Sequence, residues 1–213
     1  DELDHVGLLD VATGKVTTLY IGKPGGEVLA ASDGSWIAFE ELGTDHHDRV
    51  IVIDRGGKEL ARRDGQVASL VASPGGKLAR IAGGAVLEIK PRDPAPVFAT
   101  VPVPAGTFVH LIAYRGELLD LFAGDAILTW NGTRVWAGIP LRSGVLWAFA
   151  AGDNLSVALT NDGRIHVVGG NVAADLVLPS SPGEMVRIAA RRGISRFVST
   201  CQAALCVWNI DDV

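Results

Sequence analysis

The chain has 213 residues, of which 48% are hydrophobic, and its formal net charge at pH 7 is −5. This apolar content excludes a disordered chain, and the acidic balance argues against a nucleic-acid partner, which requires a basic surface. No stretch approaches the roughly 20 consecutive apolar residues of a membrane-spanning helix, so we expect no membrane partner.

Short apolar runs follow one another along the chain, each ended by Gly, Pro, Asp or Asn, and windows with helical spacing are scarce. This pattern predicts an all-β fold. One kind of run recurs with gaps of 44, 36, 41, 38 and 40 residues, ending at Asp10, Asp54, Lys90, Asn131, Gly169 and Asn209. A period near 40 with about four strands per unit is typical of a β-propeller blade.

Each unit is interpreted as the same four runs, beginning with an alanine-rich inner run and ending with a more polar outer one. The blade-like units cover roughly residues 27–65, 66–103, 105–142, 144–181 and 184–213, with 1–22 as a partial unit. We expect residues 1–213 to form a single β-propeller domain of four-stranded antiparallel blades.

The number of runs is compatible with either five or six blades. Five first, five second, six third and five fourth runs make twenty-one strands, whereas a ring of five blades needs twenty. Either the N-terminal strands complete the last blade and close the ring near the termini, or six blades are present and the missing strands lie outside this chain. The start at Asp1 predicts a processed product, a trimmed chain or a piece of a longer protein.

Two sequence motifs carry a resemblance to known propellers. The stretches SDGSWIAF and SPGGKLARI resemble the SPDGxxIAF hairpin of TolB-like propellers, and LCVWNID and LLDVATGKVTTL resemble the xVWDxxTGKxxxxL strand pair of WD repeats. The repeats are degenerate, since only VWN approaches the Trp-Asp dipeptide and the Gly-His pair is absent. The resemblance implies a bacterial propeller in the cytoplasm or periplasm that accompanies a protease, kinase or NTPase domain in a larger signalling or defence protein.

The longest loop between a second and a third run, EELGTDHHDR, is the candidate site. A loop that departs from the repeat is the usual place for a binding surface, so we expect partner contact at Asp45, His46, His47 and Asp48. Imidazole and carboxylate groups also suit a metal ion. Adjacent histidines rarely point at one ion, however, so we expect neither a metal nor a cofactor.

No catalytic set emerges from the sequence, because the inner runs carry almost no carboxylates apart from Glu27 and Glu184. His110 lies in an inner run, where we expect it to be buried with a hydrogen-bonding partner or to face the channel. The five tryptophans are interpreted as packing anchors, at positions 36, 130, 136, 147 and 208. The four arginines between residues 187 and 196 are interpreted as solvent-facing strand ends.

These observations favour a noncatalytic propeller that binds another protein, or a domain of its parent chain, as a sensor, scaffold or regulatory module. The alternative is a hydrolase- or lactonase-type enzyme, or a small-ligand binder, acting at the mouth of the channel.

Overall fold

The computed structural model describes residues 4–43, 48–65, 67–124, 126–141, 143–151, 155–162, 164–169, 172–177, 188–190, 196–201 and 204–209. All regular structure in these ranges is β-strand. None of the described residues forms a helix that is long and apolar enough to cross a membrane. The chain divides into two compact units, residues 1–100 and 101–213.

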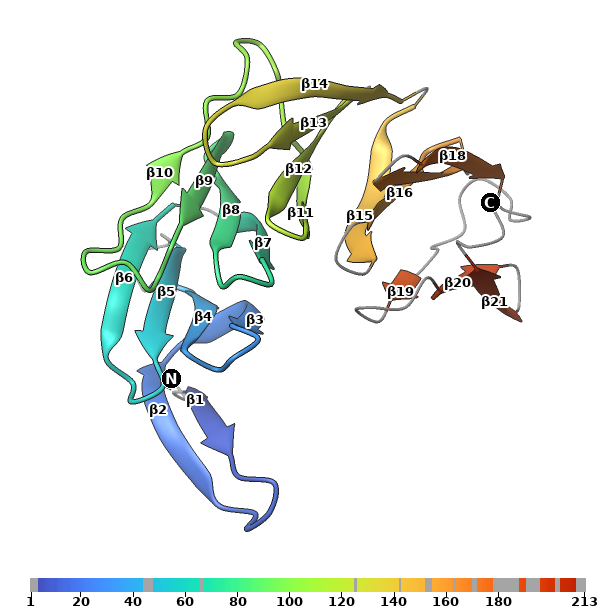
Figure 1. Ribbon diagram of the computed structural model, residues 1–213. Helices are drawn as coiled ribbons and strands as arrows, with labels where there is room; N and C mark the ends of the chain where they lie inside the picture. The colour runs from blue at the N-terminus through green and yellow to red at the C-terminus, as the bar shows by residue number, and fades with distance from the viewer. Residues whose placement is uncertain are drawn as a thin grey trace. The chain divides into compact units, whose positions relative to one another are not determined.

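The described part of the first unit contains three antiparallel sheets (Figure 1). The first has two strands, β1 (Asp4–Leu9) and β2 (Val16–Gly22). The second runs in the order β3 (Pro24–Ala30), β4 (Trp36–Glu41), β5 (Arg49–Asp54) and β6 (Glu59–Asp64). The third runs in the order β7 (Val67–Ala72), β8 (Leu78–Ala82), β9 (Ala85–Ile89) and β10 (Ala99–Thr100).

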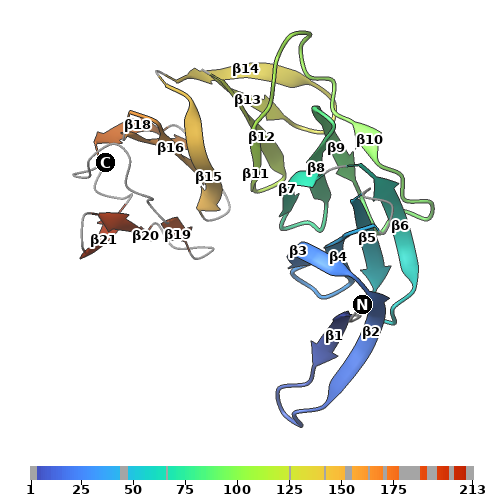
Figure 2. The ribbon, with the colours of Figure 1, turned by 180° about the vertical axis from the view of Figure 1, so that it is seen from behind.

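The described part of the second unit also contains three antiparallel sheets (Figure 2). One runs β11 (Leu111–Arg115), β12 (Leu118–Ala123), β13 (Ala126–Trp130) and β14 (Val135–Pro140). The next runs β15 (Val145–Ala151), β16 (Leu155–Thr160), β17 (Arg164–Gly169) and β18 (Val172–Val177). The last has three strands, β19 (Ile188–Ala190), β20 (Arg196–Cys201) and β21 (Ala204–Asn209). The predicted all-β fold built from four-stranded antiparallel sheets is therefore confirmed.

Three of the third strands end at a side chain that closes the following turn, which explains the Asp or Asn found there in the sequence. After β5, Oδ1 of Asp54 accepts hydrogen bonds from the backbone N–H groups of Gly56 at 2.8 Å and Lys58 at 2.9 Å. Asp10 after β1 and Asn131 after β13 accept equivalent bonds from the turns that follow them. A side-chain oxygen used in this way replaces a backbone acceptor and fixes the turn between third and fourth strands.

Apolar side chains fill the space between neighbouring sheets within each unit. In the first unit, Trp36 is fully buried between the β3–β6 and β7–β10 sheets, where it packs with Val52 and Leu78. In the second unit, Phe122 and Ala158 belong to the equivalent cluster between the β11–β14 and β15–β18 sheets. In the β3–β6 sheet the second and third strands are much more buried than the first and fourth, as expected for strands covered on both faces.

Two of the differences in strand length from the sequence prediction have a local cause. β3 begins at Pro24, three residues before the predicted run, because a register shift between Pro24 and Val28 lets its glycines extend the strand. β10 is only Ala99–Thr100, because prolines on both sides of it, at positions 96 and 102, supply no backbone N–H for pairing.

Candidate binding face of the first unit

The loop between β4 and β5 is longer than its equivalents. It has seven residues, 42–48, whereas β8 and β9 are joined by residues 83–84 and β12 and β13 by residues 124–125. Of the predicted contact residues, Asp45, His46 and His47 lie outside the described residues. Asp48 is half-buried, and its backbone carbonyl accepts a 2.8 Å hydrogen bond from the N–H of Gly65, which fixes this end of the loop to the end of β6.

The other end of the loop rests against two glycines of β3. A side chain at Gly26, whose φ is +76°, would overlap Oε2 of Glu40, and a Cβ at Gly25 would lie 2.6 Å from Cγ of Leu42. The backbone N–H of Leu42 also donates to the carbonyl of Lys23 at 2.9 Å. The absence of side chains at these glycines therefore allows the end of β4 to pack directly on β3.

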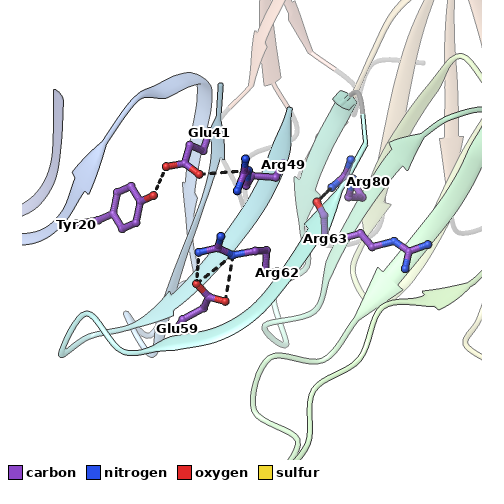
Figure 3. Close-up of polar contacts among 7 residues, drawn as sticks. All are labelled: Tyr20, Glu41, Arg49, Glu59, Arg62, Arg63 and Arg80. Atoms are coloured by element: carbon purple, nitrogen blue, oxygen red, sulfur yellow. Dashed lines mark hydrogen bonds and ion pairs between the residues drawn. The ribbon is translucent and has the colours of Figure 1, made fainter. Parts of the chain in front are cut away.

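A polar chain joins β2, β4 and β5 beside this loop (Figure 3). The Tyr20 hydroxyl donates to Oε1 of Glu41, and Nε of Arg49 lies 3.4 Å from Oε2 of the same carboxylate. Burial raises the pKa of Tyr20 to about 12, and the hydrogen bond to Glu41 adds to the effect. The phenol therefore stays protonated at neutral pH and remains a donor, which holds the Glu41 side chain in place.

Glu27 on β3 and Glu40 on β4 form an acidic pair at the same end of the sheet. Partial burial raises the pKa of Glu27, although much of the residue remains exposed. Burial also raises the pKa of Glu40, and the charges of Glu27 and Asp48 add to this effect while that of Arg80 opposes it. Both carboxyl groups are thus easier to protonate than an isolated glutamate, which makes the charge of this face sensitive to mildly acidic pH.

Arg80 on β8 places a buried positive charge near Glu40. Its side chain is fully buried and donates to the carbonyls of Arg63 at 2.9 Å and Gly65 at 2.6 Å. Burial lowers the pKa of Arg80, and the charge of Glu40 opposes that shift. The guanidinium thereby connects β8 to Arg63 near the end of β6 (Figure 3). Gly65, whose carbonyl accepts the second bond, in turn donates its N–H to the carbonyl of Asp48.

No group of three or more His, Cys, Asp or Glu within the described part of the chain is placed to hold a metal ion. When ionised, the carboxylates of Glu27 and Glu40 act only as hydrogen-bond acceptors, so they can accept from N–H donors or basic side chains.

A buried polar network in the second unit was not anticipated from the sequence. Asp120 on β12 is fully buried and accepts two hydrogen bonds from Arg115, at 2.9 and 3.1 Å. It also accepts bonds from the hydroxyl groups of Thr129 on β13, at 2.8 Å, and Ser156 on β16, at 2.6 Å. A single Asp within the apolar run LLDLFA was the available signal, and its complete set of partners indicates a structural role.

The histidines of the second unit differ from expectation. The expectation that His110 is buried is wrong, because the residue is exposed; it precedes β11 and lies edge-on to the ring of Phe108 with centroids 4.7 Å apart. The inner strand starts one residue later, at Leu111, and the backbone N–H of His110 still donates to the carbonyl of Phe122 on β12 at 2.9 Å. His166 on β17 is buried instead, with Nε2 3.3 Å from the Thr160 hydroxyl.

The tryptophans are only partly anchors of the blade packing. Trp36 and Trp130 are buried, whereas Trp136 on the outer strand β14 is 36% exposed and has the Arg134 guanidinium 5.8 Å from its ring centroid. The side chains at positions 147 and 208, and those of the arginines between 187 and 196, lie outside the described residues.

Solved structures similar to this chain are β-propellers of the WD40-like kind. Apo AztD from Citrobacter koseri is 16% identical with a TM-score of 0.66, and the match covers 95% of this chain and 61% of that one. Virginiamycin B lyase from Staphylococcus aureus is 15% identical with a TM-score of 0.63, over 97% of this chain and 77% of that one. A chain of the mitotic checkpoint complex is 17% identical with a TM-score of 0.64, over 97% and 68%.

This chain therefore spans 61% of the AztD chain that it matches, and these likenesses establish the propeller fold. No protein-family model matches the sequence. No curated protein sequence matches it either.

Proposed function

We propose that this β-propeller is a noncatalytic module that binds another protein, or a domain of its parent chain, through the face around the β4–β5 loop. The observation that carries the proposal is a loop that departs from the repeat while both of its ends are fixed. Leu42 is bonded to Lys23 at one end, and Asp48 is bonded to Gly65 at the other. A rigid scaffold that presents one irregular loop is the usual arrangement of a protein-binding site.

The chemistry around the loop supports the same proposal. Glu41 is held by Tyr20 and Arg49, so its geometry is set before any partner arrives. A preorganised side chain loses little conformational entropy on binding. The similarity to a chain of the mitotic checkpoint complex agrees with this role, because that propeller fold is found in a protein assembly.

The proposal is tested by replacing Asp45, His46, His47 and Asp48 together with Ser and Gly. We expect nearly unchanged thermal stability, because the bond from Gly65 to Asp48 uses the backbone, and a clear loss of partner binding. The matched control replaces Arg55 and Lys58 with Ser, since both are exposed in the β5–β6 turn at the opposite end of the same sheet.

Wild-type, loop-variant and control chains are used as parallel baits in an extract of the native host, and the retained protein is then purified for calorimetry. The proposal requires one protein that is retained by the wild type and the control and lost by the loop variant. Binding that differs between pH 5.5 and pH 8 would involve the imidazoles, whose ordinary pKa is about 6.5. An affinity that the loop variant retains in full at both pH values would contradict the proposal.

The finer features that the sequence resemblance implies belong to the same proposal. They are a sensor, scaffold or regulatory role beside a catalytic domain, and a cytoplasmic or periplasmic location. A pull-down that retrieves a protease, kinase or NTPase domain would support them.

A second candidate is enzymatic or small-ligand activity at the acidic pair. The raised pKa values of Glu27 and Glu40 favour it, because perturbed carboxyl groups gather at catalytic sites, and virginiamycin B lyase is an enzyme of similar fold. Metal analysis of the purified protein and a panel of ester and lactone substrates discriminate between the two candidates. Turnover that disappears in both Glu27→Gln and Glu40→Gln would favour the enzyme.

A further inference from the structure

The turn between β13 and β14 contains the chain's single Asn-Gly pair, Asn131-Gly132. Both residues are exposed, and Gly132 has a φ of +94°, a backbone conformation that other residues rarely adopt. Asparagine is a chemically labile residue, and a following glycine has no side chain to obstruct the approach of its backbone nitrogen to the asparagine amide. The sequence and exposure of this turn therefore place a reactive amide at Asn131.

Three hydrogen-bond donors converge on Oδ1 of Asn131. They are the backbone N–H of Thr133 at 3.0 Å, the Thr133 hydroxyl at 2.8 Å and the backbone N–H of Arg134 at 3.0 Å. Attack of a nucleophile on Cγ of this amide moves negative charge onto Oδ1. Donors that are already in place around an oxygen lower the barrier to such a reaction, as they do in the oxyanion hole of an acyl-transfer enzyme.

The turn after β1 shows that donors of this kind stabilise a negative charge. Oδ1 of Asp10 accepts hydrogen bonds from the backbone N–H groups of Ala12 at 2.9 Å and Thr13 at 3.3 Å. A hydrogen bond from the Thr13 side chain, followed by these two N–H groups, lowers the pKa of Asp10. Asn131 has the same kinds of donor, one threonine hydroxyl and two backbone N–H groups, so negative charge at its Oδ1 is expected to be stabilised in the same way.

We propose that Asn131 is a self-modification site, at which the backbone nitrogen of Gly132 attacks Cγ of Asn131 while the three donors to Oδ1 stabilise the developing charge. Hydroxide removes the amide proton of Gly132, and the new N–Cγ bond forms. The Cγ–Nδ2 bond then breaks, and ammonia leaves with a proton from water. Water opens the resulting succinimide ring, which leaves aspartate or isoaspartate at position 131 and adds one negative charge to the turn. This inference is independent of the proposed binding function.

The two products affect the turn differently. Aspartate keeps the acceptor in place, as the equivalent turn after β5 shows, where Oδ1 of Asp54 accepts from the N–H groups of Gly56 at 2.8 Å and Lys58 at 2.9 Å. Isoaspartate carries the main chain through Cγ of residue 131, which adds one methylene group to the backbone. It thereby lengthens a turn that is closed by a 3.3 Å bond from the N–H of Asn131 to the carbonyl of Arg134. Only the isoaspartate product is expected to destabilise the hairpin.

The reaction is measured by ageing the purified full chain at physiological temperature and mildly alkaline pH. Peptide mapping by mass spectrometry follows loss of the amide at position 131, and electron-transfer fragmentation distinguishes aspartate from isoaspartate. Asn161 is the internal control, because it is also exposed in a turn but precedes Asp162 instead of a glycine. Asn131 is expected to react at least about tenfold faster than Asn161, since only Asn131 has an unobstructed neighbouring nitrogen.

A Thr133→Val chain tests the donors, since valine keeps the side-chain shape and both backbone N–H groups but removes the hydroxyl. In the folded chain it should slow the reaction of Asn131 by about threefold to tenfold, less than for an enclosed oxyanion hole because the turn is open to water. In a synthetic peptide of residues 129–134, TWNGTR, where the turn is not held in place, the same change should leave the rate within about twofold. Circular dichroism verifies that the variant folds.

Equal rates for the wild-type and Thr133→Val folded chains would overturn the inference, and so would an Asn161 that reacts as fast as Asn131. The products are tested by melting temperature. Asn131→Asp should leave the melting temperature nearly unchanged, whereas the isoaspartate fraction of the aged chain, separated by ion exchange, should melt lower. An isoaspartate fraction that melts with the wild type would contradict the role given to the turn.

Discussion

The two units join neighbouring sheets by opposite kinds of polar contact. In the first unit, the fully buried Trp36 donates its indole N–H to the carbonyl of Gly76 at 2.9 Å, and no charged group takes part in that bond. In the second unit, the fully buried Asp120 carries a charge, which Arg115 on the same sheet and Ser156 on the next sheet satisfy. Both junctions also bury an apolar cluster.

The comparison shows that repeat packing requires satisfied polar groups but does not prescribe which ones. A buried indole carries its own large apolar surface, so burial contributes more to stability than its hydrogen bond does. A buried carboxylate contributes almost no apolar surface, and it is tolerated because each of its oxygens has donors. The first junction should therefore be destabilised most when buried apolar surface is removed. The second should be destabilised most when a buried charge loses its partner.

The largest effect is expected for Trp36→Ala. Removing a fully buried indole deletes apolar contacts on two sheets and leaves a cavity, so the free energy of unfolding should fall by about 3–5 kcal/mol. Urea unfolding followed by far-UV circular dichroism measures this. Trp36→Phe keeps most of the ring and should lose only about 1–3 kcal/mol. If the two variants lost the same free energy of unfolding, the hydrogen bond and not the buried apolar area would be what stabilises the junction.

Asp120→Ala should rank second, at about 3 kcal/mol, because it leaves the mostly buried guanidinium of Arg115 without its partner. The same urea experiment measures the loss. Asp120→Asn preserves the shape but not the charge, and it should rescue less than half of the effect. Full rescue by Asn would mean that shape and not charge holds the second junction.

A third change, Arg92→Ala, probes a surface contact beside the first junction. Arg92 pairs with Asp33 and donates to the Ser35 hydroxyl at 3.0 Å, but both charged side chains are about half exposed. The free energy of unfolding should fall by less than about 1 kcal/mol, and the difference should shrink further in high salt. A loss comparable with that of Trp36→Ala would show that this ion pair, and not the indole, governs the junction.

The smallest effect is a pH-dependent one at Glu40. Because its folded-state pKa is raised, its contribution to stability is fully present below the ordinary value of 4.5 and is lost as pH rises through the raised pKa. Glu40→Gln should therefore be slightly more stable than wild type at pH 7 and equal to it near pH 4. Melting temperatures at the two pH values measure this, and a Glu27→Gln chain should shift in the same direction. A Glu40→Gln chain that is less stable than wild type at pH 7 would contradict the prediction that the ionised Glu40 carboxylate destabilises the fold.

The strands were largely predictable because their signals are local. The turn bonds of Asp54 and Asn131 are made within a few residues of sequence, so the Asp or Asn at the end of these runs marks a real structural boundary. The length of β10 was not predicted, although its flanking prolines carried the signal. The apolar residues around β10 favour a longer strand than its flanking prolines allow.

The site was less predictable because its contacts join different strands. The sequence singled out the long loop, but it contained no sign that Gly26 accommodates Glu40 or that Tyr20 is held against Glu41. Asp120 was missed for the same reason, since its partner Ser156 is 36 residues away and lies on another sheet. Such contacts depend on how neighbouring sheets pack against each other. A single sequence shows that the sheets repeat, but it does not show which side chains meet between them.

The bond between Trp36 and Gly76 joins residues 40 apart, close to one repeat, and the bond between Ser156 and Asp120 spans 36. Contacts of this span couple a sheet only to its immediate neighbour, so folding is expected to proceed as nearest-neighbour growth from whichever adjacent pair of sheets forms first. The cooperativity of the chain then depends on a few junctions in series. A weakened junction would divide the unfolding transition at that point while the sheets on either side remain folded.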